Sequence, residues 1–334
     1  MNTKELIERY IQGERDFCNS NLASANLIGA TLTRANLSRS NLNEASLARA
    51  HLERCFFTGA TLIDAFLYSA DLSFAKLDNA DLRGADLTKT NLRGARLDHA
   101  DLEGAKLSGA IVTWVSLFGA NLPNVNLCGA NLNGINLRSA NLSGANLDWT
   151  NLSGARLSGA NLSGTSLNGV KLKGAWMNGL KLGNVNFSGM DLSDIKLSGA
   201  NLDTANLSGA NLSDGIMPLA SLNQADLRGA DITHSKLQYS LCRGANFMKT
   251  QLVDTNLCQA DLREANLNLA NLSGSNLRRA DLQSAYLWGT NLTDVDLSGA
   301  NLSGASLRNA TLDGVKLEGA ILTGATMPDG SIHA

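Results

Sequence analysis

Residues 140–165 read ANLSGANLDWTNLSGARLSGANLSGT, and this stretch shows the rule on which the whole chain is built. A leucine recurs at every fifth residue, a small residue stands two places before it, and Asn or Asp directly precedes it. The frame runs from Phe17 to Ile332 through 64 repeats without an insertion or a deletion. We call the leucine position the centre and the position two residues before it the small position, so the repeating unit is A(N/D)LXX.

A period of five fits neither a helix nor a regular strand. A helix turns once every 3.6 residues, so a five-residue repeat would spread the leucines around all of its sides. A strand alternates with a period of two, so the same repeat would reverse the leucine face each time. The pattern is satisfied if the chain bends once per repeat, with the centre and small residues pointing inward and the other three outward. The period alone does not determine how many repeats close one coil.

Tandem A(N/D)LXX units resemble the pentapeptide-repeat family, and the resemblance covers about residues 15–332. It implies an all-β fold, a right-handed quadrilateral parallel β-helix with four repeats per coil. The chain would then form about 16 coils, and a separation of ~4.8 Å between paired strands would give a rod of roughly 75 Å. Each centre leucine would stack on the one in the next coil, and burying such a side chain contributes ~1.5–3 kcal/mol.

The two ends of the repeat are expected to be closed by other structures. Residues 2–12 predict a short helix with Asn2 as its N-cap, Glu5 three residues later in a capping box, and Gly13 after its end. The apolar stripe that would cover the first coil comprises Leu6, Ile7, Tyr10 and Ile11. At the other end, Pro328 and the pair Asp329-Gly330 predict a turn that ends the solenoid.

The predicted organisation is therefore a capping helix at 1–14, a β-helix at 15–327 and a tail at 328–334. Residues 5–17 and 327–334 are similar to the leader and the ending of many cyanobacterial members of the family, including a heterocyst regulator. The resemblance implies a cyanobacterial origin. Because such ends cap the fold, they report on stability and assign no function.

Charge and cysteine content bear on the class of partner. The formal net charge is −2 and the pI is near 6.1. A nucleic-acid binder usually carries a basic surplus, and a mimic of nucleic acid needs an acidic one. Five scattered cysteines without zinc spacing are typical of reduced thiols, and Cys242 replaces a core leucine. There is no signal-peptide core and no apolar run that could cross a membrane, so we expect a cytoplasmic protein.

One group of outward-facing aromatic and aliphatic residues is a candidate partner surface. It comprises Phe74, Ile111, Trp114 and Phe118. If residues 20 apart lie above one another, Phe74 shares a column with Trp114 and Gly94 lies between them. Exposed aromatic clusters mark partner surfaces. The alternative is that each ring lies flat over a glycine and packs on its own coil, and the sequence leaves both interpretations open.

Two further features have a structural alternative. One outer column contains the cations Lys76, Arg96, Arg156, Lys196, Lys236 and Lys316, but Asp78, Asp98 and Glu318 follow two residues after three of them and would partly neutralise the stripe. The consensus weakens at 165–195, where most small positions hold bulky residues, at 215–219, and at 235–242. Bulged corners or a recessed binding surface are alternatives there, and relaxed packing is expected in preference to both.

These observations favour a non-enzymatic scaffold for protein–protein interaction with an unidentified protein partner and a monomeric or weakly dimeric state. The resemblance adds the expectation of a regulatory role in a cyanobacterium. The alternative is a gyrase-interacting mimic of DNA, which the near-neutral charge disfavours because mimicry needs anionic groups spaced like phosphates. Catalysis is not expected, because the carboxylates are dispersed and the histidines have no neighbouring nucleophile. No cofactor, metal, nucleic acid or membrane is expected as a partner, and an ice-binding threonine array fails at His51 and Asp71.

Overall fold

The computed structural model describes all 334 residues, and they divide into two compact units. Unit 1 is Met1–Leu172 and unit 2 is Lys173–Ala334. Their boundary falls inside the 165–195 stretch, where bulky residues occupy most small positions. The prediction of one β-helix over 15–327 stays a prediction, and the two units are described separately below.

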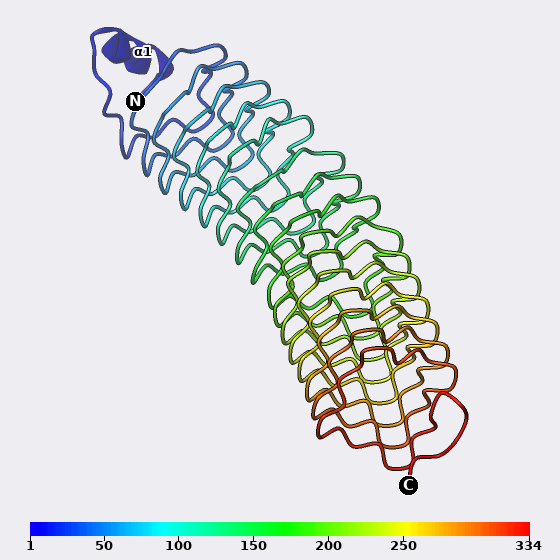
Figure 1. Ribbon diagram of the computed structural model, residues 1–334. Coiled ribbons are helices and arrows are strands. Elements are labelled where there is room, and N and C mark those ends of the chain that lie inside the picture. The colour runs from blue at the N-terminus through cyan, green and yellow to red at the C-terminus, as the bar shows by residue number, and fades with distance from the viewer. The chain divides into compact units, whose positions relative to one another are not determined.

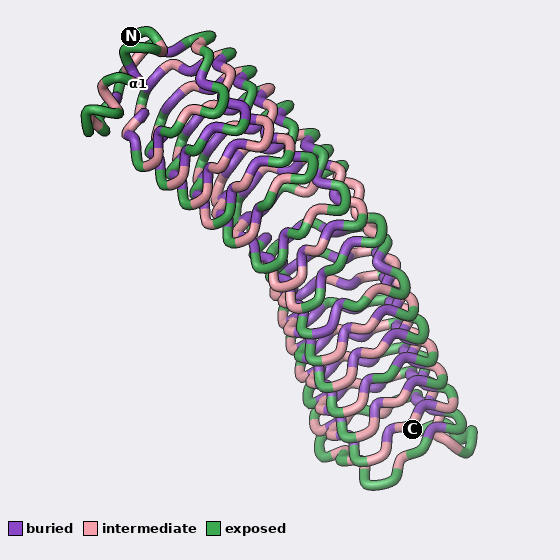
Figure 2. The backbone as a smooth tube through the Cα atoms, turned by 90° about the horizontal axis from the view of Figure 1, so that it is seen from above, coloured by how far each residue is buried: buried purple, intermediate pink, exposed green.

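Both units are built from the same coil. The residue before each centre pairs in parallel with the residue twenty positions later, from Asp16–Asn36 to Asn151–Lys171 in unit 1 and from Trp176–Lys196 to Ser306–Thr326 in unit 2. A spacing of twenty residues means four pentapeptides per coil, as predicted. Each repeat contributes a single paired residue, so no longer strand forms. Within each unit, buried segments alternate with exposed corners along every coil (Figure 2).

The remaining residues of each repeat make a tight turn. The small residue donates its N–H to the centre carbonyl three residues earlier, for example Ala25 to Leu22 at 3.1 Å. The residue before the small position has a positive φ, for example +56° at Asn19. A bond of this type with positive φ at the third residue is a type II turn. The centre and the small residue therefore point into the coil, and almost all of them are buried.

The structure explains why Asn or Asp precedes the centre. In unit 1 the Asn141 side chain accepts the Ser143 N–H through Oδ1 at 3.2 Å and donates from Nδ2 to Oδ1 of Asn121, one coil earlier, at 2.8 Å. The first bond satisfies an N–H that the ladder does not use. The second links successive coils along one side. Asn and Asp suit this position because their short side chains readily bond the backbone two residues on.

The N-terminal helix α1 spans Thr3–Ile11 and lies beside the first coils of unit 1 (Figure 1). Asn2 accepts the Glu5 N–H at 2.9 Å, which confirms the predicted N-cap. Leu6 is fully buried, and the Tyr10 hydroxyl donates to the Thr33 carbonyl at 3.1 Å. The predicted stripe is wrong at Ile11, which is 77% exposed because it lies at the last position of the helix and lines an open groove between the helix and residues 26–31.

Two of the off-consensus segments in unit 2 keep the regular coil. Ile216 pairs with both Lys196 and Lys236, and Met217 is buried at the centre position. Pro218 occupies the second residue of the turn, where proline is favoured and where the ladder uses no N–H. Ile216 has no side-chain acceptor to cap the turn, but residue 218 is proline and has no N–H that needs a cap. No donor is therefore left unpaired. Cys242 is fully buried, as expected for a small core residue.

The chain reverses at Pro328–Gly330, and the tail folds back on the last coil of unit 2. Thr326 pairs antiparallel with Ile332, and the Met327 N–H donates to the Ser331 carbonyl at 2.7 Å. The predicted turn at Asp329-Gly330 is thus present. It converts the parallel ladder into a local antiparallel pair at this end of unit 2.

Unit 1 contains one interruption of its ladder. The pairs that would join Lys106 to Asn126 and Ile111 to Asn131 are absent, whereas Asp101–Asn121 and Ser116–Asn136 are present. The coils therefore separate along two of their sides and leave a cleft of about 340 Å³, lined by 107–110 and 126–131. The small positions around this separation hold Val115, Val125 and Ile135, all buried. In unit 2, Val295 is an equally bulky small residue beside intact pairs, so bulk alone does not part the coils.

Candidate partner-binding edge

One corner of unit 1 carries arginine and aromatic side chains in successive coils. The column contains, in order, Arg34, Arg54, Phe74, Gly94 and Trp114, at twenty-residue intervals. All five are the positive-φ residue of their turn, so the side chains of the four that are not glycine leave from a corner of the coil. We call this column, together with Arg93, the arginine–aromatic edge.

The two aromatic residues of the edge are packed differently. Phe74 lies over Gly94 in the next coil, because a Cβ added to Gly94 would stand 2.6 Å from the ring atoms Cδ1 and Cε1. Trp149 covers Gly169 in the same way. Trp114 does not: no atom lies within 4 Å of a Cβ added to Gly134, the next residue of its column. The flat-over-glycine interpretation therefore holds for Phe74 and fails for Trp114.

The cleft accounts for the missing contact between Trp114 and the glycine of the next coil. This residue belongs to the coil that separates from the next one, and its N–H lacks the ladder bond that the neighbouring coils form. Its side chain is 69% exposed. The Arg93 guanidinium covers the ring, with Cζ 4.6 Å from the ring centroid, and Arg54 approaches Phe74 at 5.8 Å. Each exposed ring of the edge therefore carries a cation on or beside its face.

The guanidinium groups of the edge have no acidic partner. None of Arg34, Arg54 and Arg93 has a carboxylate oxygen within 4.0 Å. Glu53, which lies next to Arg54 in sequence, accepts the Thr33 hydroxyl at 2.7 Å and lies 3.4 Å from the His51 ring. The edge therefore keeps its positive charge and free N–H donors.

The other two residues of the predicted surface flank this edge. Ile111 is 51% exposed and lies on the side of the coil that leads to Trp114. Phe118 lies at the following corner, half-buried, with its ring edge-on to His99 at 5.2 Å and with Arg138 at 5.5 Å. The structure thus brings Phe74, Ile111 and Trp114 to one corner and places Phe118 at the next.

A contact between coils holds Phe118 in place. Ser116 stands where Asn or Asp usually caps the turn, and it is too short to do so. Asp98, one coil earlier, accepts the Phe118 N–H at 3.2 Å and the Ser116 hydroxyl through the same oxygen. The same compensation occurs where Asp148 accepts the Asn168 N–H at 2.8 Å. An acid from the preceding coil therefore replaces the missing cap.

The column of cations is partly neutralised, as the sequence indicated. Arg96 lies 3.2 Å from Asp78 and 3.9 Å from Asp98. Asp78 Oδ1 is buried without a hydrogen-bond partner, so the nearby Arg96 charge offsets the cost of burying it. Lys76 lies over the Phe56 ring at 5.0 Å instead of pairing with an acid.

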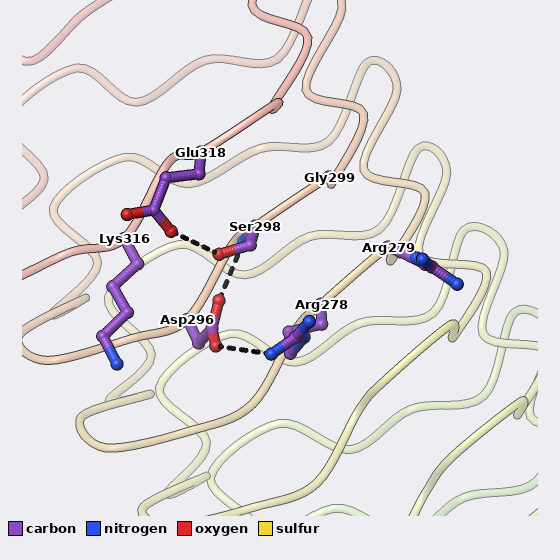
Figure 3. Close-up of a pocket in the computed structure, with 7 residues that line it drawn as sticks. All are labelled: Arg278, Arg279, Asp296, Ser298, Gly299, Lys316 and Glu318. Atoms are coloured by element: carbon purple, nitrogen blue, oxygen red, sulfur yellow. Dashed lines mark hydrogen bonds and ion pairs between the residues drawn. The ribbon is translucent and has the colours of Figure 1, made fainter.

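A shallow polar pocket in unit 2 does not form a convergent site. It is lined by Arg278, Arg279, Asp296, Ser298, Gly299, Lys316 and Glu318 and has a volume of about 420 Å³. Both donors of Ser298 are already used inside the protein. Its hydroxyl donates to Glu318 at 3.3 Å, and its N–H donates to Asp296 at 2.9 Å. Figure 3 shows the free cations Arg279 and Lys316 pointing in different directions. The pocket therefore offers no common point for a ligand.

The titratable groups also give no catalytic arrangement. His234 lies between Asp214 at 3.9 Å and Asp254 at 3.6 Å, and all three side chains are exposed. Burial raises the pKa of the Cys55 and Cys242 thiols to about 12, so neither is a nucleophile at neutral pH. No group of three or more His, Cys, Asp or Glu residues is placed to hold a metal ion. No helix has the length and apolar character needed to cross a membrane.

The comparison with protein families identifies the class. The family model for pentapeptide repeats matches residues 16–113, 120–217 and 225–327 in overlapping copies. The chain therefore belongs to the pentapeptide-repeat family, and its fold is the right-handed quadrilateral β-helix predicted from the resemblance. The first break in the match, 114–119, contains Trp114 and Phe118 of the candidate surface.

Several solved structures are similar to the chain. HetL of the cyanobacterium Nostoc sp. strain PCC 7120, a pentapeptide repeat protein involved in heterocyst differentiation regulation, is 28% identical over 100% of both chains, with a TM-score of 0.17. QnrB1, a plasmid-mediated fluoroquinolone resistance protein, is 24% identical over 45% of this chain and 83% of its own, with a TM-score of 0.38. The Nostoc pentapeptide repeat protein alr5209 is 32% identical over 36% of this chain and 80% of its own, with a TM-score of 0.15. No curated protein matches the chain.

Sequence reasoning missed two parts of this surface. It did not join Arg34, Arg54 and Arg93 to the aromatic group, although the twenty-residue column already placed the first two in line with Phe74. It also overlooked the cleft. Val115, Val125 and Ile135 stand at small positions around the cleft, but Val295 does so where the ladder is intact, so such residues do not mark a cleft in the sequence.

Proposed function

We propose that this protein is a non-enzymatic scaffold that binds a partner protein through the arginine–aromatic edge of unit 1. Trp114 carries the proposal. It is the aromatic residue in this column of the predicted surface that does not lie on the glycine of the next coil, because the coils part beside it. Exposed Trp flanked by Arg is the composition of residues that dominate binding energy at protein interfaces.

The surrounding fold suits a binding role. Trp114 and Phe74 project from turns whose backbone is held by coil-to-coil bonds on at least one side, such as the Phe74 N–H to the Arg93 carbonyl at 2.8 Å. A side chain mounted on a rigid ladder loses little freedom when it is buried by a partner. The dispersed carboxylates and unreactive thiols support a role without catalysis.

The test is affinity capture from the source organism followed by mass spectrometry. The bait proteins are the wild type, Trp114→Ser and Trp149→Ser. Trp149 is a matched control because it is also 69% exposed and occupies the same position of its turn, but it lies over Gly169. We expect Trp114→Ser to lose a partner that the wild type and Trp149→Ser both retain. Equal capture by all three baits would refute the edge as the binding surface.

A second pair of baits tests the rest of the predicted surface. Ile111→Ser and Phe118→Ser should weaken capture less than Trp114→Ser, because Ile111 is smaller and Phe118 is already half-covered by His99 and Arg138. A larger loss at Phe118 than at Trp114 would move the binding surface to the neighbouring corner.

A further inference from the structure

The charges of the arginine–aromatic edge specify more about the partner than its aromatic residues do. Three guanidinium groups stand along it without a carboxylate partner. Each presents a fork of N–H donors that matches a carboxylate in a two-bond geometry. Arginine held against an aromatic face is also pre-organised, so it loses less freedom on binding than a mobile side chain.

The edge is divided along its length. Arg34 and Arg54 occupy two successive coils, and Phe74, Gly94 and Trp114 occupy the next three, with Arg93 beside the last ring. Four coil-to-coil steps at ~4.8 Å separate the ends of the column by about 19 Å, the length of about six residues of extended chain. An occupant that follows the edge would therefore meet charge at one end and apolar rings at the other.

From this geometry we infer that the edge binds an extended acidic segment of the partner, and the inference rests on the proposed function. Asp or Glu side chains at one end of the segment pair with Arg34 and Arg54. Apolar side chains at the other end cover the Trp114 ring and the Phe74 ring, which lies over Gly94. A further carboxylate reaches Arg93 beside the Trp114 ring.

A nucleic acid suits the edge less well. Base stacking needs an open aromatic face. Here Arg93 already occupies a face of Trp114, and Phe74 lies on Gly94. Binding of a phosphate backbone depends on a broad basic surface, whereas this chain has a net charge of −2 and Arg96 of its other cation column is paired with Asp78 and Asp98.

The test uses the full chain and displayed random octapeptides. Peptides enriched on the wild type are sequenced, and the best is made with a fluorescent label for binding by fluorescence anisotropy. We expect enriched peptides to carry at least two acidic residues beside apolar ones, and we expect their affinity to fall as salt is added. Peptides without acidic residues, or no enrichment above uncoated support, would overturn the inference.

Variants locate the peptide on the edge. Arg54→Gln and Trp114→Ser should each weaken the labelled peptide at least about tenfold, because a charge-assisted hydrogen bond or a buried Trp contributes one decade or more in affinity. Arg279→Gln and Trp149→Ser are the controls, since Arg279 has the same turn position in unit 2 and no carboxylate within 4.0 Å. They should change the affinity by less than about twofold, as expected for sites outside the edge. Equal loss in Arg54→Gln and Arg279→Gln would overturn the assignment.

Two further measurements test whether a nucleic acid or a second copy of the chain binds the edge instead. A labelled single-stranded oligonucleotide that binds more tightly than the peptide, with the same dependence on Arg54, would replace the inference with nucleic-acid binding. Sedimentation of the wild type and of Trp114→Ser would show a dimer lost in the variant if a second copy covers the edge. If cellular capture depends on Trp114 but the selected peptides are not acidic, the proposed function stands and only this inference fails.

Discussion

Replacing Gly94 with alanine should destabilise unit 1 more than the same change at Gly134. Both glycines lie in one column, with φ of +66° and +65°, so alanine pays a similar backbone cost of about 1–2 kcal/mol at each. At Gly94 the new Cβ would also stand 2.6 Å from two Phe74 ring atoms, whereas nothing lies within 4 Å at Gly134. The ring must then leave its preferred rotamer, which costs a further ~0.5–1.5 kcal/mol.

The measurement is equilibrium urea unfolding followed by far-ultraviolet circular dichroism, in a double-mutant cycle with Phe74→Ala. If the extra cost comes from the ring, Gly94→Ala in the Phe74→Ala background should cost no more than Gly134→Ala. A coupling energy of about 0.5–1.5 kcal/mol between the two sites follows. If Gly94→Ala costs the same stability with and without the Phe74 ring, the contact between that ring and Gly94 in the arginine–aromatic edge is refuted.

Three other outcomes follow from the structure. Asp98→Ala should destabilise the protein by about 1–3 kcal/mol in urea unfolding, because it leaves the Phe118 N–H unpaired. Adding Ser116→Asn should restore the lost stability, because Asn at position 116 can cap the turn within its own repeat. Absence of this rescue would contradict the account. The amides of Leu107 and Val112, beside the cleft, should exchange with deuterium faster than those of Leu87 and Leu92, which donate to carbonyls of the next coil at 2.8 Å; equal protection would mean that the cleft is closed in solution. In native protein at pH 8, iodoacetamide should modify exposed Cys128 but not Cys242, whose pKa of about 12 leaves almost no thiolate until the pH approaches that value. Exposed Cys18 should react more slowly than Cys128, because the hydrogen bond with Asp16 raises the pKa of its thiol. Mass spectrometry showing Cys242 modified at the same rate as Cys128 would rule out its burial.

The candidate site could be predicted only in part from the sequence. Phe74, Ile111, Trp114 and Phe118 were recognised as outward-facing because their places in the repeat are fixed relative to the centre leucine. Their exposure could not be ranked in this way. Whether a ring covers a glycine depends on side-chain direction and on the height of the next coil, so Phe74 and Trp114 differ although they share a column.

The sequence by itself determined which residues of each repeat point inward, whereas closure of a coil after four repeats was implied by the family resemblance and is shown by the pairing of residues twenty apart. A centre leucine and a small residue in an unbroken period of five allow one inward-facing pattern, and the repeat supplies the turn and the Asn or Asp cap within five residues. These are local interactions, which is why they can be read from a single repeat. Only the tertiary structure decided where the ladder parts, between the coils that contain Lys106 and Asn126, and which arginines remain without an acid. Both depend on contacts between neighbouring coils, which join residues about twenty positions apart in the sequence.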